Sequence, residues 1–184
     1  MAERDCCVII ATMSAPMNLY LLRHGIAEAA DPARFPDDSL RPLSARGHEQ
    51  MARIAQAMRR LGLGIDLIWT SPLVRTRQTA TAVAEALASA DRVHSAAHLA
   101  PDGDPRMLLD HLARLDPRPA NVLFVGHEPC LSGLLSVLTS GGSAVRAKVK
   151  KGSLAKLEVT GPIHFGQCAT LRWLVPPNLL VTLD

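Results

Sequence analysis

The sequence has few aromatic residues: Phe, Trp and Tyr make up 3% of its 184 residues, whereas hydrophobic residues make up 48%. We therefore expect one domain with a core of aliphatic side chains, because a chain of this length can bury a full core. Net charge is also small, at +3. Such mild basicity is compatible with anionic ligands, but it lacks the dense basic arm of a nucleic-acid-binding protein, so no nucleic-acid partner is predicted.

Two further absences exclude whole classes of protein. No apolar stretch approaches the roughly 20 residues of a membrane-spanning helix, so no membrane association is predicted. The four cysteines form no CxxC pair and no zinc-binding spacing. None is followed six positions later by an arginine, which excludes the loop of the cysteine-dependent phosphatases. We expect free thiols in a reduced, cytoplasmic protein.

The chain divides into an extension and one domain. The run Cys6–Met13 is apolar but short and is preceded by acidic residues, whereas a secretory signal has a basic start and a longer apolar region. Residues 1–16 are therefore predicted to be a loosely ordered N-terminal extension. Residues 17–184 are predicted to form a single domain.

Within that domain, strand and helix patterns alternate. Apolar runs predict buried strands at 18–22, 67–69 and 121–125, with a short strand near Val93. Caps and apolar periodicity predict helices over about 44–61, 73–88, 105–115 and around 131–138. Residues 154–159 and 170–175 alternate apolar and polar, as paired antiparallel strands do. This order predicts an α/β fold, a three-layer α/β/α sandwich with a mostly parallel central sheet and a C-terminal antiparallel ribbon.

Two histidines stand directly after predicted buried strands. Arg23-His24-Gly25 follows residues 18–22, and Gly126-His127-Glu128-Pro129 follows residues 121–125. Open α/β sheets bind ligands at the carboxyl ends of their strands. The arginine offers a planar fork to a phosphoryl or carboxylate group, and the glycine lets the backbone approach a ligand closely. One such histidine is more often a loop residue, but the repetition favours phosphoryl transfer through histidine.

A third segment, Thr70 to Ala80, supports an anion site. It follows the apolar run 67–69, and Ser71 with Pro72 is typical of a helix start, with the serine as cap. Arg75 then falls near the positive end of the helix dipole, where an arginine does little for the helix itself. We expect it to hold an anion bound at that end. Capping is the default role of Ser71, and donation of its hydroxyl to phosphate is the alternative.

In this order and spacing, the motifs Leu-Arg-His-Gly, Ser-Pro-Leu-Val-Arg-Thr-Arg-Gln-Thr-Ala and Gly-His-Glu-Pro resemble the histidine phosphatase superfamily, which includes phosphoglycerate mutases and acid phosphatases. The segments Asp38–Gly47 and Leu99–Asp104, together with the short length, are similar to the SixA-type phosphohistidine phosphatase branch. The resemblance covers the chain from about Met17 to its end.

The resemblance implies a phosphate pocket formed by Arg23, His24, Arg75 and His127. In this pocket, His24 would attack phosphorus, because an imidazole has a large neutral fraction near pH 7. It would become a phosphohistidine, which water then hydrolyses. The arginines would neutralise the phosphoryl charge, and His127 would stabilise charge in the transition state. No metal and no cofactor is predicted, since no third ligand stands at a usual spacing from the histidines.

The proton donor is the open part of this site. Larger relatives use a glutamate or an aspartate, and the nearest analogues here are Asp102 and Asp104. We assign Asp104 as the candidate acid; its alternative role is capping of the helix that Pro105 opens. Glu28 and Glu128 are expected to be solvated loop charges. A phosphoramidate leaving group needs less acid assistance than an alkoxide, which favours a phosphohistidine substrate.

The remaining charged residues receive structural roles. Asp38 and Arg41 are expected to pair with each other or to shape the pocket rim, and Arg77 to lie on the surface. The basic run 146–151 is expected to form a solvated face, with the alternative that it steers acidic protein partners.

The sequence thus predicts a metal-independent phosphatase that dephosphorylates phosphohistidine on proteins, with an open site that a protein surface can enter. A phosphomonoesterase that acts on a small phosphorylated metabolite is the first alternative. A non-catalytic phosphate-recognition module is the second. The sequence does not define the oligomeric state.

Overall fold

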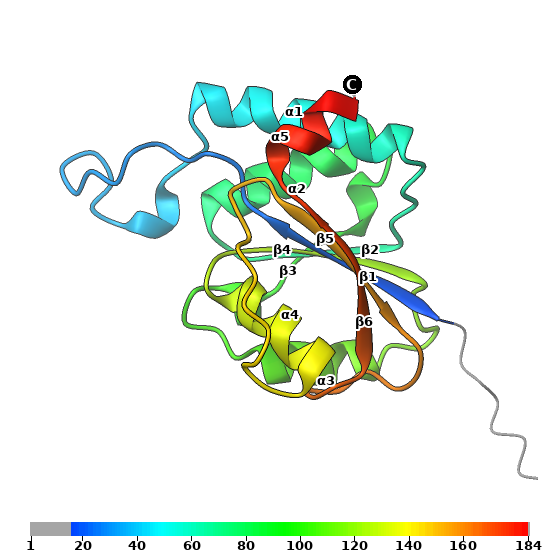
Figure 1. Ribbon diagram of the computed structural model, residues 1–184. Coiled ribbons are helices and arrows are strands. Elements are labelled where there is room, and N and C mark those ends of the chain that lie inside the picture. The colour runs from blue at the N-terminus through cyan, green and yellow to red at the C-terminus, as the bar shows by residue number, and fades with distance from the viewer. Residues whose placement is uncertain (1–15, 184) are drawn as a thin grey trace, which may run out of the picture.

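A computed structural model describes residues 16–183, and helices cover both faces of its central sheet (Figure 1). The predicted N-terminal extension lies outside the described residues except for residue 16. The strands are β1 (Met17–Arg23), β2 (Leu67–Thr70), β3 (Val93–Ser95), β4 (Asn121–Gly126), β5 (Leu154–Val159) and β6 (Ala169–Val175). The helices are α1 (Ala45–Arg60), α2 (Val74–Ala86), α3 (Pro105–Ala113), α4 (Cys130–Ser140) and α5 (Pro177–Leu180). Short 3-10 turns are η1 (Asp38–Leu40), η2 (Ala90–Arg92), η3 (Ala97–Leu99) and η4 (Val181–Leu183).

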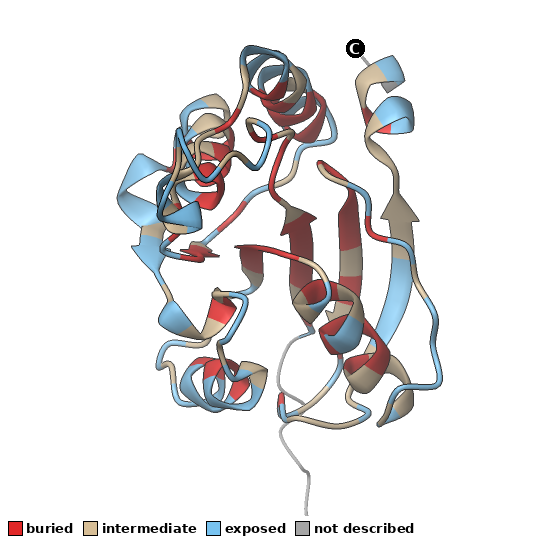
Figure 2. Cartoon of the chain, turned by 90° about the vertical axis from the view of Figure 1, so that its left-hand side faces the viewer, coloured by how far each residue is buried: buried red, intermediate tan, exposed pale blue. Residues whose placement is uncertain are grey.

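The sheet has the strand order β3-β2-β4-β1-β5-β6. Strands β3, β2, β4 and β1 are parallel, and β5 and β6 add an antiparallel pair at one side. This confirms the predicted α/β fold with a mostly parallel sheet and a C-terminal antiparallel ribbon. The central strands are buried along their length, whereas the edge strand β6 is largely half-buried or exposed (Figure 2).

The aliphatic core lies in two layers, one on each face of the sheet. Alternate side chains of β1 serve both layers: Leu19 and Leu21 pack with residues of α3 and α4, and Tyr20 and Leu22 pack with residues of α1 and α2. A strand that is buried on both faces does not alternate apolar and polar residues, because neither face meets solvent. That is why its sequence is a continuous apolar run.

The helix ends follow the predicted signals in most places. Helix α1 begins after Ser44, whose hydroxyl accepts a hydrogen bond from the Gly47 amide at 3.1 Å, and Gly62 follows it with a φ of +65°. Two details were wrong. Leu61 continues the helical spacing of the apolar residues Met51, Ile54 and Met58, a pattern that predicts its burial with them, but it is 47% exposed. The small helix α5, which buries Leu180 beside α1, had not been predicted.

The start of α2 also differs from the prediction. The helix begins at Val74 rather than after Ser71, and the residue before it, Leu73, provides no side-chain cap. The Ser71 hydroxyl accepts only a long hydrogen bond from the Leu73 amide, at 3.4 Å. Ser71 therefore lies in the turn that joins β2 to α2, outside the helix.

Candidate active site

The strand register brings the two histidines together. Arg23 at the end of β1 pairs with Gly126 at the end of β4, so the next residues, His24 and His127, leave the sheet at the same edge. Their ring centroids lie 5.0 Å apart, and the His24 amide donates to the Gly126 carbonyl at 3.1 Å. Both side chains are buried, His24 with 5% and His127 with 3% of its surface exposed.

The protonation state of His24 follows from its neighbours. Its Nδ1 atom lies 2.7 Å from the Gly25 carbonyl oxygen, which can only accept, so Nδ1 carries the proton and Nε2 bears the lone pair. Burial lowers the pKa of His24 to about 3. The hydrogen bond to Gly25 opposes this shift, whereas the interaction with the His127 ring and the charges of Arg75 and Arg23 act in the same direction as burial. At neutral pH the imidazole is uncharged, with a free nitrogen lone pair.

His127 is held by the turn before α2. Its Nε2 atom lies 2.9 Å from the hydroxyl of Ser71, which is completely buried and whose amide donates to the Val125 carbonyl at 3.0 Å. Burial lowers the pKa of His127 to about 4, with further contributions from Arg75 and Arg23. The serine expected to cap a helix thus contacts a site histidine.

Arg75 reaches the site from the first turn of α2 and is only 4% exposed. Its Nη1 atom donates to the Asp38 carbonyl at 2.8 Å, and its Nη2 atom lies 3.0 Å from the Asp38 carboxylate. The Thr79 hydroxyl donates to the Arg75 carbonyl at 2.7 Å and accepts from the Gly25 amide at 3.1 Å. The first turns of α2 are therefore fixed to the backbone beside His24.

Arg23 approaches from the end of β1. Its Nη1 atom donates to the Val149 carbonyl at 2.8 Å. The Nε atoms of Arg23 and Arg75 are both buried and have no hydrogen-bond partner. Buried polar groups are nearly always paired, so two unpaired guanidinium N–H groups beside two neutral imidazoles indicate a site built to receive an anion.

Asp38 and Arg41 form the rim of this site. Arg41 donates from Nε to the Asp38 carboxylate at 2.7 Å and from Nη1 to the Glu28 carbonyl at 2.9 Å. The hydrogen bond from Arg41 and the charge of Arg75 hold the pKa of Asp38 below its usual range. Both expectations for this pair therefore apply, because the two side chains pair with each other and also orient Arg75.

Asp104 is placed differently from the other candidates. Its side chain accepts from the Arg106 amide at 2.8 Å and caps α3, and the residue is exposed. The carboxylate whose charge acts on His127 is that of Asp38. The structure thus brings together Arg23, His24, Arg75 and His127 and gives Asp104 the capping contact that was its alternative role.

The other acidic candidates have partners of their own. Glu28 lies 3.5 Å from Arg34 in an exposed ion pair. Glu128 accepts from the Ser132 hydroxyl at 2.5 Å, while its second oxygen is buried without a partner.

Lys151 is less exposed than its sequence context indicated, because the basic run was expected to form a solvated face. It is half-buried, whereas Lys148 and Lys150 are exposed. Burial and then the charges of Arg23, Arg41 and Arg75 lower the pKa of Lys151. The signal that could have indicated it is its place just before β5, the strand that runs antiparallel to β1.

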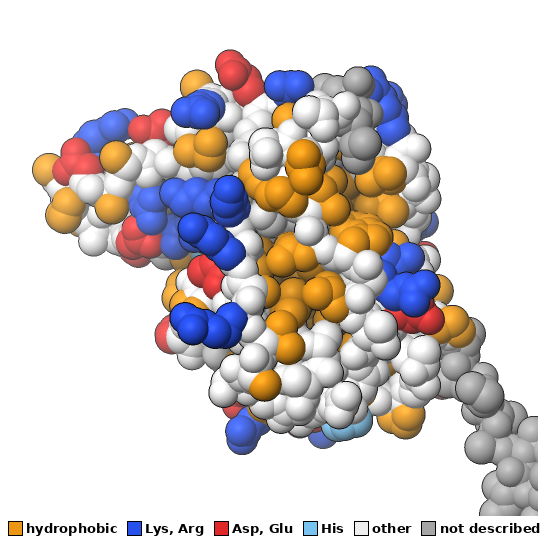
Figure 3. Space-filling model, viewed as in Figure 1, with side chains coloured by type: hydrophobic (Ala, Val, Ile, Leu, Met, Phe, Trp, Pro, Cys, Tyr) orange, Lys and Arg blue, Asp and Glu red, His pale blue; other side chains and the backbone are white. Residues whose placement is uncertain are grey.

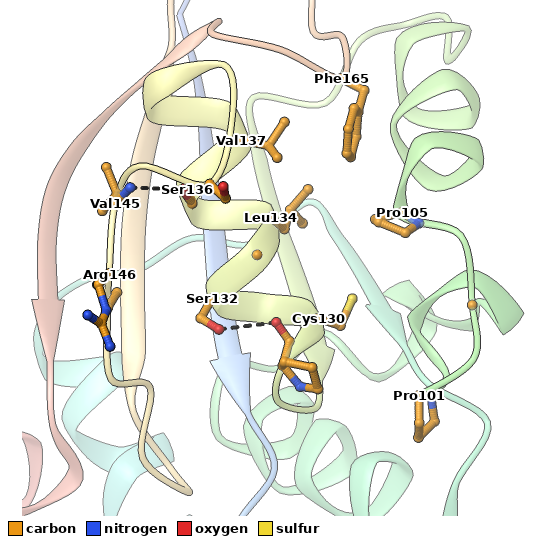
Figure 4. Close-up of a pocket in the computed structure, with 15 residues that line it drawn as sticks. Pro101, Pro105, Cys130, Ser132, Leu134, Ser136, Val137, Val145, Arg146 and Phe165 are labelled. Carbon is orange, nitrogen blue, oxygen red and sulfur yellow. Dashed lines mark hydrogen bonds between the residues drawn. The ribbon is translucent and has the colours of Figure 1, made fainter.

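A separate apolar cavity of about 550 Å³ borders the site from the α4 side (Figure 4). Pro129 and Cys130, directly after Glu128, line one part, and Leu134, Val137 and Phe165 line another. It contains neither of the site histidines, so the polar chemistry described above lies outside it.

Two features are absent from the part of the chain that the structure describes. Within residues 16–183, no three or more His, Cys, Asp and Glu side chains are grouped so that they could hold a metal ion. No helix over the same range is long and apolar enough to span a membrane.

Comparisons with known proteins agree with this geometry. The model of the histidine phosphatase superfamily, branch 1, matches residues 19–99. An uncharacterized protein of Picosynechococcus sp. is 37% identical over 169 residues, which cover 87% of this chain and 100% of that protein. The phosphohistidine phosphatase SixA of Escherichia coli (strain K12) is 29% identical over 126 residues, 68% of this chain and 76% of its own length.

A solved structure of the protein histidine phosphatase SixA complexed with tungstate has the same fold, with a TM-score of 0.77 at 24% identity over 89% of this chain and 99% of that one. The family match and the similarity to SixA support a phosphatase, a hydrolase of phosphorylated compounds. The chain belongs to the histidine phosphatase superfamily, and its similarities place it in the SixA-type branch.

Proposed function

We propose that this phosphatase removes phosphoryl groups from phosphohistidine on proteins, through a covalent phosphohistidine at its own His24. The observation that carries the proposal is the uncharged His24 imidazole, whose Nε2 lone pair is left free by the Nδ1 bond to Gly25. The unpaired Nε atoms of Arg23 and Arg75 support it, because they are donors suited to phosphoryl oxygens.

The reaction has two displacements. In the first, Nε2 of His24 attacks phosphorus while the bond from phosphorus to the substrate nitrogen breaks, and the departing imidazole takes a proton from water or from the candidate acid, Asp104. In the second, water attacks the phosphohistidine, inorganic phosphate leaves and His24 regains its lone pair. Arg23, Arg75 and His127 stabilise the charge on the phosphoryl oxygens in both steps.

The substrate class follows from the weak provision for acid catalysis. Asp104 remains our candidate acid, but it is engaged as a helix cap, and Asp38 is bound by two arginines that keep it ionised. A site with so little acid assistance suits a phosphoramidate better than an alkyl phosphate ester. The SixA relative is named as a phosphohistidine phosphatase, which supports the same choice. We infer a cytoplasmic enzyme that works without metal.

The test is a labelling experiment with a radiolabelled phosphohistidine peptide. The parent protein and His94→Asn, a variant of an exposed histidine on β3, should acquire label and release phosphate. His24→Asn should do neither. Turnover in His24→Asn equal to that of the parent would refute the covalent mechanism.

The same assay separates the alternatives. Faster hydrolysis of simple phosphate monoesters than of the phosphohistidine peptide would point to a phosphomonoesterase of small metabolites. A parent protein that binds phosphate but is never labelled and releases none would be a recognition module.

A further inference from the structure

Lys151 is held beside the phosphate pocket by the backbone of its own loop. The Val149 carbonyl accepts from Arg23 at 2.8 Å, and the Gly152 amide donates to the carbonyls of Arg23, at 3.0 Å, and His24, at 3.2 Å. The Lys151 carbonyl accepts from the Gln50 side chain at 3.2 Å. Position 151 is thus fixed on both sides to the end of β1, where the nucleophile stands.

The Lys151 ammonium lies among like charges. Burial, and then the charges of Arg23, Arg41 and Arg75, lower its pKa. Figure 3 shows Lys and Arg side chains gathered on the left of this face, where the segment of residues 28–43 leaves the body of the molecule. Among residues 16–183, the Lys151 ammonium has no hydrogen-bond or ion-pair partner.

The site as a whole is short of negative charge. Its rim carboxylate, Asp38, is already shared by Arg41 and Arg75. The buried Nε atoms of Arg23 and Arg75 lack partners, although Arg75 is only 4% exposed. Holding unpaired cationic donors away from water costs free energy, which an anion with several acceptor oxygens can recover.

We propose that Lys151 is a further phosphoryl-binding residue, whose ammonium contacts an oxygen of the bound phosphoryl group beside Arg23 and Arg75. This inference rests on the proposed function. A lysine ammonium is a point charge on a flexible stem, so it can follow the phosphoryl group from the substrate to His24. The fixed arginine forks, in contrast, define where the group sits.

A competing explanation is that the basic loop only steers acidic partners toward the site. Steering acts through the summed charge, so the exposed Lys148 and Lys150 would matter as much as Lys151, and salt would weaken all three effects. A contact with the phosphoryl group requires Lys151 alone. The two exposed lysines therefore provide matched controls on the same loop.

The experiment compares Lys148→Met, Lys150→Met and Lys151→Met with the parent, using inorganic phosphate as the probe in titration calorimetry at low and high salt. Lys151→Met should weaken phosphate binding by about tenfold or more, consistent with loss of a charge-assisted hydrogen bond. Lys148→Met and Lys150→Met should stay within about twofold. Lys151→Arg, which keeps the charge, should restore part of the affinity and of kcat/KM on a phosphohistidine peptide.

The outcomes against the inference are distinct. Parent-like phosphate binding by Lys151→Met, or equal losses in the three methionine variants, would overturn it and leave the proposed function intact. A parent protein that neither bound phosphate nor released it from the peptide would overturn the proposed function, and this inference with it. Unfolding midpoints of all variants, compared by circular dichroism, identify any loss that is due to misfolding.

Discussion

The Nδ1 atom of His24 lies 2.7 Å from the carbonyl oxygen of Gly25, the next residue along the chain. The geometry selects one tautomer, because a carbonyl oxygen only accepts hydrogen bonds. Burial then keeps the ring uncharged at neutral pH by lowering the pKa of His24 to about 3. Nucleophile orientation is thus a property of a local backbone contact as well as of the pocket.

This contact predicts which nitrogen carries the phosphoryl group. Label trapped on His24 should be on Nε2, because Nδ1 is occupied by the hydrogen bond to Gly25. Phosphorus NMR of the trapped enzyme, compared with standards of the two phosphohistidine isomers, distinguishes the positions. A phosphoryl group found on Nδ1 would mean that the imidazole ring rotates and breaks its hydrogen bond to Gly25 before it reacts.

A second prediction concerns two arginines on the same helix. Arg75→Ala should lower kcat/KM by roughly 10²- to 10³-fold, a loss of about 3–4 kcal/mol of transition-state stabilisation, because the buried guanidinium faces the site. Arg77→Ala, a change to an exposed residue two positions along α2, should change it less than about twofold. Steady-state kinetics on a phosphohistidine peptide measure both effects. Comparable losses of kcat/KM in the two variants would show that the overall positive charge, and not the position of Arg75, supports the activity.

The placement of the four pocket residues, Arg23, His24, Arg75 and His127, could be predicted because it depends on local sequence signals. Strand runs before His24 and His127 end at positions that the parallel register of β1 and β4 aligns. Arg75 stands at a fixed distance from the end of β2, which is also parallel to β4. Parallel strands bring their carboxyl ends to one edge, so the places of the motifs after their strands favoured a common site, and the family resemblance implied the set of four residues.

The supporting residues could not be predicted in this way. Serine is a common helix-capping residue, so the sequence favoured a capping role for Ser71. Because α2 begins only at Val74, the Ser71 hydroxyl lies outside the helix and contacts His127 instead. Asp38 reaches Arg75 from the 3-10 turn η1, 37 positions away, and a turn of three residues is too short to show a hydrophobic period in the sequence. Lys151 comes beside Arg23 through the antiparallel return of β5, a pairing that depends on tertiary register.

The buried histidines should make the folded protein sensitive to acid. The pKa of His127 is about 4 in the folded protein, against roughly 6.5 in an unfolded chain. Between these values the unfolded chain binds more protons, so the free energy of unfolding rises with pH and falls as the pH is lowered below about 6.5. The loss from His127 between pH 7 and pH 5 is roughly 1–2 kcal/mol.

Urea unfolding of the parent and of His127→Gln at these two pH values measures this effect. The glutamine does not titrate, so the variant should lose less stability on acidification, whatever its stability at pH 7. An identical pH dependence in the two proteins would show that His127 has the same pKa in the folded protein as in the unfolded chain, so that burial does not keep it uncharged.

The loop that carries Lys151 depends on one glycine. Gly152 has a φ of +81°, in the region that residues other than glycine rarely adopt, and a Cβ there would lie 2.8 Å from the Ile54 side chain. Gly152→Ala should therefore destabilise the protein by about 1–3 kcal/mol. It should also lower kcat/KM, because the Gly152 amide is hydrogen-bonded to the carbonyls of Arg23 and His24.

Gly142→Ala is the control, since nothing lies within 4 Å of a Cβ at that position, and it should change stability by less than about 0.5 kcal/mol. Thermal unfolding and peptide kinetics on both variants test the coupling: a Gly152→Ala protein as stable and as active as the parent would show that the loop adapts without moving the end of β1.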